Sequence, residues 1–580
     1  MAGLDLLMSR ARLATGLGAA VLAWLAWRGV GVSPWWLAVP TTLFVVLVVA
    51  HGRVIALHRR AKRSVAFYEW GLARLDHQWV GKGEAGERFL DEAHLYSADL
   101  DLFGRGSLFE LLCTARTQAG EETLADWLLA PASPGDLRDR QDAIRELRPL
   151  IDLREDLASL GVEVRAGVHP GSLAAWGTAA PALPSKITRG AAALLAVFGV
   201  ATLSWWWADV IGPMPFVVAL ASDIAFAWPL RARVRRVIGG VDAACHELAL
   251  LADILARLEH ERFTSSRLVA LRASLDSDGK SPSQRIATLR RLIDLLDARR
   301  NQLFAPVSYL LLWGTQFAHA IEAWRAVSGP AVPRWLAAVG EFEALCALAG
   351  YAWENPEDPF PDVVAVDHGP RFEAEALGHP LIAREVCRCN DVRLVGEGSG
   401  PGPRALVVSG SNMSGKSTLL RTVGINAVLA LAGAPVRARR LTMTPLAVGA
   451  TLRIHDSLQT GTSRFYAEIT RLRKIVDLAG GTPPPLFLLD EMLDGTNSHD
   501  RRIGAEGLLR GLIGRGGIGL VTTHDLALSQ IADDLAPRAA NVHFEDHLEG
   551  GVMTFDYLCR PGIMTKSNAL ALMRAVGLEL

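Results

Sequence analysis

The stretch that decides the fold of the C-terminal part of this chain is Ala405–Thr418, which reads ALVVSGSNMSGKST. An apolar, β-prone run enters a glycine-rich turn, and Gly-Lys-Ser-Thr then opens a helical pattern. This is the GxxxxGKS phosphate-binding loop in the strand–loop–helix context that it requires. Gly410 and Gly415 permit backbone angles that a Cβ would forbid, so successive N–H groups can face a β-phosphate. The pattern predicts a site for a nucleoside triphosphate rather than a glycine turn that binds nothing.

Two side chains of this loop carry the expected ligand chemistry. Lys416 is expected to neutralise oxygens of the β- and γ-phosphates, and the Ser417 hydroxyl to ligate Mg²⁺. The sequence therefore predicts ATP and Mg²⁺ as cofactors. The predicted ATP-binding residues of the loop are Gly410, Ser411, Asn412, Met413, Ser414, Gly415, Lys416, Ser417 and Thr418.

Two further apolar runs end in polar residues. Pro485–Leu489 is followed by Asp490 and Glu491, and Gly517–Thr523 is followed by His524. Asp490 suits a role in holding Mg²⁺, and Glu491 can polarise the attacking water. A lone histidine is more often structural, but at a strand tip it is placed to sense a γ-phosphate. The predicted catalytic residues are Lys416, Glu491 and His524, and the predicted metal-binding residues are Ser417 and Asp490.

These same segments resemble the MutS family of DNA-repair ATPases. The phosphate loop is similar to that family's loop, with Ser414 where the family usually has Gly, and His524 resembles its switch histidine. Asp456–Glu468 (DSLQTGTSRFYAE) is similar to the family's signature segment, in which a Ser reaches the γ-phosphate held by the other subunit. Here that residue is Ser463. The resemblance implies an ABC-type ATPase that works as a homodimer with composite ATP sites.

The resemblance extends upstream of the loop. Residues 378–380 and 390–391 resemble the family's nucleotide-entry stretch, but residues 387–389 read Cys-Arg-Cys where an aromatic or apolar pair is usual. The adenine-stacking residue is therefore not identified from the sequence. Segments within residues 106–143 resemble the start of the family's helical core, or lever, domain, and residues 341–345 resemble its last helix.

Other parts of the family's apparatus have no counterpart in the sequence. Nothing upstream of residue 95 resembles the mismatch-reading domain or the connector that follows it. The helices that normally carry a DNA clamp are joined by a short polar turn around Asp276 to Ser283. The formal net charge of −1 does not indicate nucleic-acid binding. Any DNA binding is therefore expected to be weak and of low specificity.

Apolar runs dominate two other regions. Hydrophobic residues make up 50% of the 580 residues. They are concentrated in two pairs of apolar runs, residues 13–32 with 35–51 and residues 190–207 with 215–230. Each run is near the ~20 residues that cross a bilayer. Basic residues flank both pairs, which predicts two transmembrane hairpins inserted from the cytoplasmic face. The alternative is buried core helices, and the second pair is interrupted by Asp223.

The predicted fold is multidomain, with transmembrane helical hairpins, an α-helical MutS-type core or lever domain, and a C-terminal α/β ABC-type P-loop ATPase. A further apolar stretch, Leu303–Ile321, is expected to be a lever helix of the core. The predicted location is the cell (inner or plasma) membrane, multi-pass, with the ATPase domain in the cytoplasm. The expected boundaries are 1–65 for the first hairpin, 66–186 and 237–365 for the core, 187–236 for the second hairpin and 366–580 for the ATPase.

Two classes of function remain open. The first is a membrane-anchored MutS-like ATPase that binds DNA or serves DNA repair. The second is an ATP-driven membrane-remodelling, transport or signalling protein, in which the lever helices move the hairpins and no DNA is bound. An ordinary ABC transporter is disfavoured, because no LSGGQ-like segment lies between the phosphate loop and Asp490. The partners expected from these two interpretations are a second copy of the chain, the lipid bilayer and DNA, which would be bound with low specificity.

Overall fold

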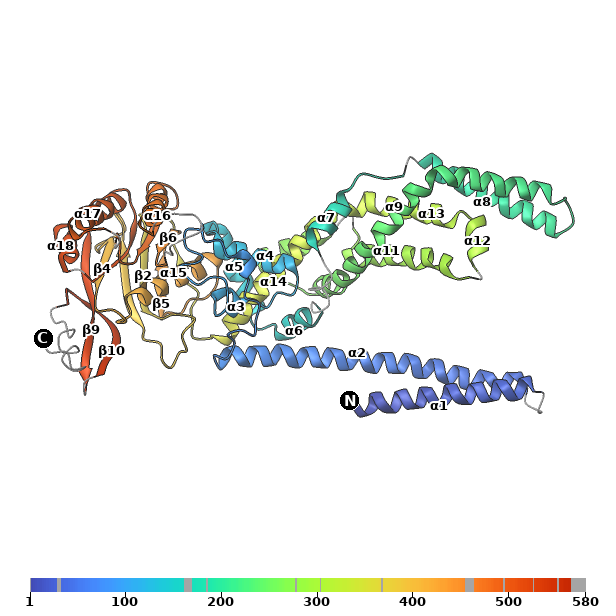
Figure 1. Ribbon diagram of the computed structural model, residues 1–580, viewed down its shortest axis with the longest axis horizontal. Helices are drawn as coiled ribbons and strands as arrows, with labels where there is room; N and C mark the ends of the chain where they lie inside the picture. The colour runs from blue at the N-terminus through green and yellow to red at the C-terminus, as the bar shows by residue number, and fades with distance from the viewer. Residues whose placement is uncertain are drawn as a thin grey trace. The chain divides into compact units, whose positions relative to one another are not determined.

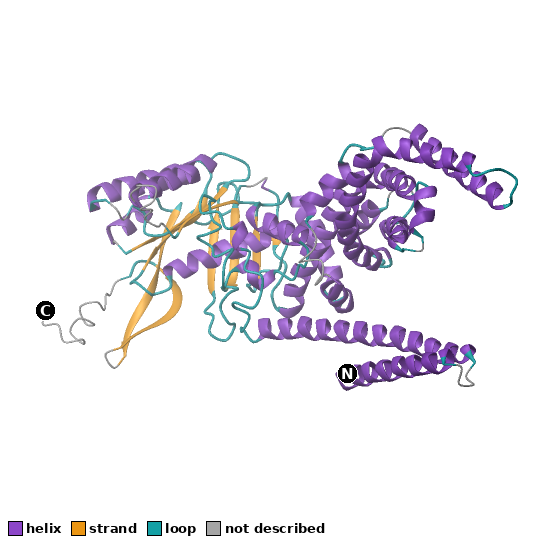
Figure 2. Ribbon diagram, turned by 45° about the vertical axis from the view of Figure 1, so that its right-hand side comes forward, coloured by secondary structure: helices purple, strands orange, loops and turns teal. Residues whose placement is uncertain are grey.

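The computed structural model describes residues 2–28, 33–160, 169–183, 186–276, 279–302, 304–366, 369–453, 464–493, 496–524, 526–549 and 552–564. The chain divides into two compact units, Met1–Ala73 and Arg74–Leu580, which are described separately below. The first unit is helical. The second consists of a helical part followed by an α/β domain, as Figures 1 and 2 show.

The first unit is a pair of helices. Helix α1 (Ala2–Trp27) and helix α2 (Ala38–Leu75) are separated by the short 3-10 helix η1 (Pro34–Leu37). The apolar runs predicted at 13–32 and 35–51 fall largely on α1 and α2, and both helices extend beyond them. Large apolar side chains on both helices and on η1 are exposed to the surroundings. Among them are Leu13, Leu17, Trp24, Trp27, Trp35, Trp36, Val45 and Val46.

Three helical stretches are long and apolar enough to cross a membrane, judged by length and composition. They are Trp35–Leu75, Ile187–Trp207 and Trp313–Glu354, and their most apolar windows are 6%, 22% and 89% buried, respectively. The third stretch is covered by other helices, so it belongs to the core. The single lever helix expected over Leu303–Ile321 is wrong, because Leu312, with a φ of 47°, separates one helix ending at Leu310 from another beginning at Trp313. The first two stretches each coincide with one helix of a predicted hairpin.

The second unit begins with short helices that pack around its core. They are η2 (Glu87–Phe89), α3 (Leu108–Leu112), α4 (Gln118–Leu129), α5 (Pro134–Leu147), α6 (Ile151–Leu160) and α7 (Pro170–Thr178). Helices α3, α4 and α5 begin where the side chains of Ser107, Thr117 and Ser133 each accept a hydrogen bond from the backbone N–H three residues on. This is the usual N-cap, which satisfies a backbone donor that the helix itself cannot pair.

The second predicted hairpin corresponds to helix α8 (Lys186–Trp207) and the N-terminal part of helix α9 (Met214–Glu259). Helix α9 runs through residue 236, the expected end of the hairpin, without a break, so one helix of 46 residues joins the hairpin to the core. The helices that follow are α10 (Ser266–Leu275), α11 (Pro282–Asp297), η3 (Ala298–Arg300), α12 (Ala305–Leu310), α13 (Trp313–Ser328), η4 (Gly329–Ala331) and α14 (Val332–Glu354).

Helices α4 and α14 pack closely through glycines. A Cβ added to Gly340 would lie 2.7 Å from the Ala119 carbonyl oxygen, so the two backbones are nearly in contact. One turn further along α14, the buried Glu343 carboxylate accepts hydrogen bonds from the backbone N–H groups of Arg116 (3.2 Å) and Thr117 (3.0 Å). Burial raises the pKa of Glu343 to about 7 in spite of these hydrogen bonds. This contact fixes the start of α4 against the helix that leads to the α/β domain.

The α/β domain contains a six-stranded sheet of order β10-β9-β4-β8-β7-β6. All neighbouring strands are parallel except β9 and β10. The strands are β4 (Ala405–Ser409), β6 (Ala447–Thr451), β7 (Pro485–Leu489), β8 (Ile518–Thr523), β9 (Ala539–Glu549) and β10 (Val552–Pro561), and the helices are α15 (Lys416–Ala432), α16 (Arg464–Leu478), α17 (Ser498–Gly514) and α18 (Leu526–Asp534). Because carboxyl ends of parallel strands meet at one edge, the polar tips of β4, β7 and β8 are brought together there.

A second, four-stranded sheet has the order β1-β5-β2-β3. Its strands are β1 (Asp362–Val363), β2 (Arg371–Leu377), β3 (Asn390–Val395) and β5 (Arg440–Met443). The helical N-terminal part and the C-terminal α/β domain predicted from the sequence are therefore confirmed.

The glycine contact between α4 and α14 generates a stability prediction. Gly340→Ala should lower the free energy of unfolding by about 1–3 kcal/mol, because the new methyl group overlaps the Ala119 carbonyl. Gly239→Ala in α9 is the matched control: its Cβ would meet nothing within 4 Å, so only the gain in helix propensity remains. Thermal unfolding of the detergent-solubilised chain compares the two variants, and a Gly340→Ala midpoint at or above that of the parent would contradict the prediction.

Candidate functional site

The phosphate loop lies between β4 and α15, as predicted, and α15 begins at Lys416. Gly410 and Gly415 have φ angles of 154° and 106°, and the exposed Met413 has a φ of 68°. The Lys416 ammonium is buried within the loop and donates hydrogen bonds to the carbonyl oxygens of Gly410 (2.8 Å) and Ser411 (3.0 Å). The glycines are thus required where the backbone turns, and the lysine lies at the centre of the turn.

The acidic tip of β7 lies beside this lysine. Glu491 Oε1 is 3.8 Å from Lys416 Nζ and 3.5 Å from His524 Nδ1. The three residues predicted to be catalytic therefore lie together, although they come from α15, the end of β7 and the end of β8. Glu491 has a φ of 44°, an unfavourable angle for a side chain with a Cβ, which indicates that its surroundings hold it in place.

Thr522 of β8 fixes the acidic tip. Its hydroxyl donates to Asp490 Oδ1 and accepts from the backbone N–H of Glu491 at 3.0 Å. The Asp490 N–H in turn donates to the Thr451 carbonyl oxygen at 3.0 Å, which ties the tip to β6. Both carboxylates are thereby placed by neighbouring strands, which is the rigid support that a catalytic group needs.

Burial is the main electrostatic influence on the lysine. It lowers the pKa of Lys416, and the nearby carboxylates of Glu491 and Asp490 oppose that effect by raising it. The buried ammonium attracts a ligand with negative charge. The two carboxylates beside it attract a divalent cation. Mg²⁺-bound phosphates have this combination.

Ser417 and Asp490 are the residues that would hold Mg²⁺. Their hydroxyl and carboxylate oxygens are ligands that this cation prefers, and nucleotide sites usually supply only one or two protein ligands, with phosphates and water completing the shell. In the described part of the chain, no group of three or more His, Cys, Asp or Glu residues could hold a metal ion without such additional ligands. The residues present therefore fit Mg²⁺ bound together with a triphosphate.

Ser414 is accommodated by Gly410. A Cβ at Gly410 would lie 2.7 Å from Ser414 Oγ, so the serine fits because position 410 has no side chain. Within the described residues, the buried hydroxyls of Ser411 and Ser414 have no hydrogen-bond partner. Buried hydroxyls without partners are costly, and phosphate oxygens are suitable acceptors for them.

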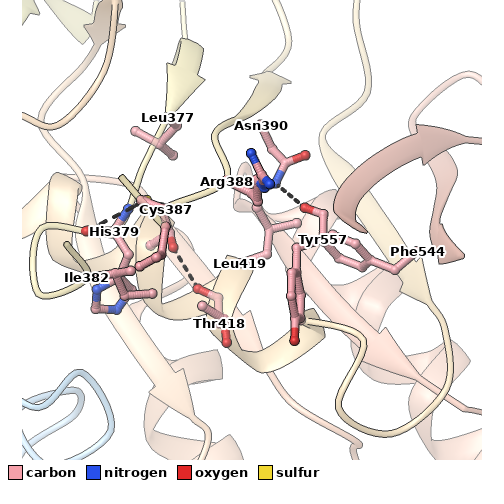
Figure 3. Close-up of a pocket in the computed structure, with 13 residues that line it drawn as sticks. Leu377, His379, Ile382, Cys387, Arg388, Asn390, Thr418, Leu419, Phe544 and Tyr557 are labelled. Atoms are coloured by element: carbon pink, nitrogen blue, oxygen red, sulfur yellow. Dashed lines mark hydrogen bonds between the residues drawn. The ribbon is translucent and has the colours of Figure 1, made fainter. Parts of the chain in front are cut away.

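A cavity of about 170 Å³ opens beside the phosphate loop (Figure 3). Its walls come from the entry stretch after β2, from α15, and from β9 and β10, and they are mainly apolar. A concave, mainly apolar site with a few polar groups suits the base of a nucleotide. The lining residues are Leu377, His379, Ile382, Val386, Cys387, Arg388, Asn390, Gly415, Thr418, Leu419, Thr422, Phe544 and Tyr557.

Asn390 connects two walls of this cavity. Its amide donates to the Tyr557 carbonyl oxygen (3.1 Å) and accepts from the Cys559 N–H (2.7 Å), which joins β3 to β10. The neighbouring Asp391 accepts from the Ala376 N–H (2.8 Å), where β2 departs from regular pairing with β3. The Asn-Asp pair predicted to belong to the nucleotide-entry stretch thus braces the backbone around the cavity.

Tyr557 was not identified from the sequence. The pairing of β10 with β9 shifts between Phe555 and Cys559, and Tyr557 has a φ of 58° there. Its ring lines the cavity close to Gly415, where an added Cβ would lie 3.2 Å from the ring (Figure 3). An irregular strand far downstream of the loop carries no sequence signal for this placement. Tyr557 is the aromatic side chain best placed to stack on a base.

His379 and Cys387, from the predicted entry stretch, also line the cavity. The His379 N–H donates to Cys387 Sγ at 3.3 Å, and its Nδ1 accepts from the Leu381 N–H at 3.3 Å. Burial, assisted by Arg421 and Arg437, lowers the pKa of His379 to about 4, so its imidazole is neutral at physiological pH. His379 therefore acts as a fixed part of the wall.

Ser463 and most of the predicted signature segment lie outside the described residues, so its role remains a prediction. The residues that flank the segment are anchored to the helical part through Asp99. This buried carboxylate accepts from the backbone N–H groups of Leu452 and Arg453, both at 2.7 Å, and pairs with Arg471 of α16. Asp99 was not recognised from the sequence either, because its partners are over 350 residues away.

Comparison with known protein families found a match, and it covers most of the α/β domain that carries this site. Residues 406–579 match the model of MutS domain V, which is the ATPase domain of the MutS family. The match begins in β4 and includes the phosphate loop, the acidic tip, His524 and Tyr557. The C-terminal domain of this chain is therefore similar to MutS domain V over residues 406–579.

Proposed function

We propose that this chain is a membrane-anchored MutS-like ATPase that hydrolyses ATP in composite sites of a homodimer. The observation that carries the proposal is the meeting of Lys416, Glu491 and His524 at one edge of the sheet, beside a cavity suited to a base. The match to MutS domain V supports the ATPase part of this proposal.

Each side chain has a distinct role in the proposed reaction. Lys416 neutralises β- and γ-phosphate oxygens, and Mg²⁺ held by Ser417 and Asp490 supplies further positive charge when it is bound. The Glu491 carboxylate accepts a hydrogen bond from the attacking water and polarises it. His524, 3.5 Å from the Glu491 carboxylate, is placed to orient that group and to sense the γ-phosphate.

Membrane anchoring is proposed for the hairpins α1/α2 and α8/α9. The most apolar windows of Trp35–Leu75 and Ile187–Trp207 are only 6% and 22% buried, so their apolar side chains lack protein cover. Such surfaces are stable in lipid and costly in water. The basic residues that flank both pairs favour a cytoplasmic ATPase domain.

The role of DNA separates the two classes of function. The family resemblance favours weak DNA binding without mismatch recognition. The unbroken helix α9, which belongs to both the hairpin and the core, favours the second candidate, in which ATP-driven motion of the core moves the membrane hairpin. Binding of duplex DNA by the detergent-solubilised chain, measured against salt concentration, distinguishes them, since phosphate contacts give a steep salt dependence.

Hydrolysis is tested with two substitutions. Lys416→Ala should abolish tight ATP binding, because the charge facing the phosphates is lost. Glu491→Gln should preserve binding and lower kcat about 10²–10⁴-fold, because water activation is removed. Glu397→Gln, which alters a surface carboxylate paired with Arg404, is the control that should keep the parental rate. A parental rate in Glu491→Gln would exclude Glu491 as the general base.

The base cavity is tested at Tyr557. Tyr557→Ala should weaken ATP binding by about 1–3 kcal/mol, the usual contribution of an aromatic ring stacked on a base. Tyr557→Phe keeps the ring and should bind nearly as well as the parent, so the pair separates loss of stacking from loss of the hydroxyl. Titration with a fluorescent ATP analogue measures both. Equal affinities for the alanine variant and the parent would remove Tyr557 from the base site.

The composite site is tested by mixing inactive chains. Lys416→Ala and Ser463→Ala homodimers should each lack an intact site, because one loses the phosphate lysine and the other the serine supplied to the partner. An equal mixture should regain ATPase activity, since the heterodimer has one site with both residues. Size-exclusion chromatography confirms that mixed dimers form. Mixed dimers without activity would argue against a serine supplied by the partner.

A further inference from the structure

A second cavity lies in the helical part, at the foot of the α8/α9 hairpin. Its volume is about 550 Å³, and its walls come from α9, η3, α12 and the start of α13. On α9 the lining begins where the apolar run expected at 215–230 gives way to basic residues. The lining residues are Ala227, Arg231, Val234, Arg235, Arg299, Arg300, Ala305, Ser308, Tyr309, Leu312, Trp313, Gly314 and Thr315.

Arginines give this cavity a positive charge. Arg300 pairs with Asp242 at 3.5 Å and with Asp297 at 3.3 Å. The guanidinium of Arg231 lies over the Trp228 ring at 3.8 Å from its centroid, and two further arginines line the wall. All the lining residues belong to the described part of the chain, and none is an Asp or a Glu. Because Arg300 is already paired with two carboxylates outside the lining, the positive charge offered to a ligand comes mainly from Arg231, Arg235 and Arg299. Guanidinium groups of this kind are well suited to bind phosphate.

The wall opposite α9 is aromatic and fixed in place. Trp313 donates from its indole N–H to the Leu295 carbonyl oxygen at 2.8 Å and packs edge-on against Phe304. Leu312, with a φ of 47°, interrupts the helical backbone between α12 and α13. Such an angle is unfavourable for a residue with a Cβ and is often retained at ligand sites. Tyr309, 77% exposed, stands at the same wall.

Exposed apolar side chains continue from this cavity along α9. Ile224 and Trp228, one to two turns before Arg231, are 57% and 61% exposed, and Val217 and Val218 lie further along the same helix. A basic, concave site thus adjoins an apolar surface that has no protein cover. A ligand that matches both would have an anionic head and apolar chains.

We propose that this cavity binds the phosphate-ester headgroup of an anionic membrane lipid, whose acyl chains lie along the exposed face of α9. The proposal rests on the membrane anchoring proposed above. A free phosphate ester shares the headgroup chemistry, but only a lipid also covers the apolar surface. Duplex DNA is disfavoured, because its backbone follows an open basic track, whereas these arginines line a recess. Basic pockets beside membrane helices on the cytoplasmic side are suited to such headgroups.

Native mass spectrometry of the full detergent-solubilised chain tests the site. The probes are phosphatidylglycerol, phosphatidylcholine and the soluble headgroup analogue glycerol 3-phosphate. We expect selective retention of phosphatidylglycerol. The double variant Arg231→Gln/Arg235→Gln should weaken that binding about thirtyfold, or about fivefold for each arginine. Arg233→Gln/Arg236→Gln removes the same charge from exposed positions of α9 outside the cavity, and it should bind like the parent.

Each other outcome would overturn the proposal. Unchanged binding in Arg231→Gln/Arg235→Gln would place the lipid elsewhere, and an equal loss in both double variants would indicate diffuse surface charge. Glycerol 3-phosphate binding as tightly as the lipid would identify a free phosphate ester as the ligand. Competition by a short DNA duplex would identify a nucleic-acid contact. ATPase activity, measured on each variant, confirms that the chain is folded.

Membrane anchoring is measured separately on the same proteins. Flotation with pure phosphatidylcholine vesicles at high salt detects insertion of the hairpins and does not depend on the headgroup site. Loss of flotation for the parent would contradict anchoring itself. Flotation of all variants, combined with no selective retention of phosphatidylglycerol in the mass spectra, would contradict only the headgroup site.

Discussion

The buried Asp99 carboxylate links the helical part of the second unit to its ATPase domain. It accepts hydrogen bonds from Leu452 and Arg453 immediately before the predicted signature segment, and it pairs with Arg471 after that segment. Burial raises the pKa of Asp99, and the charge of Arg471 is the first of the interactions that oppose this shift. Loss of Arg471 would leave the buried Asp99 carboxylate without its main opposite charge, which usually costs several kcal/mol. The described residues on either side of the predicted signature segment are therefore tied to the helical part.

Packed helices continue from the site toward the hairpin. Helix α15, which starts in the phosphate loop, contacts α4, and α4 packs against α14 through Gly120 and Gly340. Helix α14 contacts α9, and α9 extends without interruption into the second hairpin. The contact between α4 and α14 is the closest of these, and together they give a continuous path of packed helices from the phosphate loop to α9. This continuity gives the proposed membrane-moving function a structural basis that does not require DNA.

The sequence predicted those parts of the site that rest on short-range patterns. The phosphate loop, the acid pair after β7 and the histidine after β8 follow apolar strands, and a parallel sheet necessarily gathers such strand ends at one edge. Tyr557 and Asp99 escaped prediction for a different reason. One owes its position to an irregularity in β10, and the other to partners distant in sequence. The extent of α9 was also not foreseen, because its apolar run ends at residue 230 while helical geometry continues to Glu259.

The position of Lys416 relates nucleotide binding to the activation of water. Its ammonium donates to two carbonyl oxygens of the loop and lies 3.8 Å from the Glu491 carboxylate. Phosphate oxygens would compete with both for this charge, since they are stronger acceptors than carbonyl oxygens and carry more charge than one carboxylate. If the ammonium is drawn toward phosphate, His524 is the predicted catalytic group that remains beside the Glu491 carboxylate. The shift of the Lys416 ammonium toward the phosphates would therefore free the Glu491 carboxylate to polarise water. In the proposed site, hydrolysis thus follows nucleotide binding.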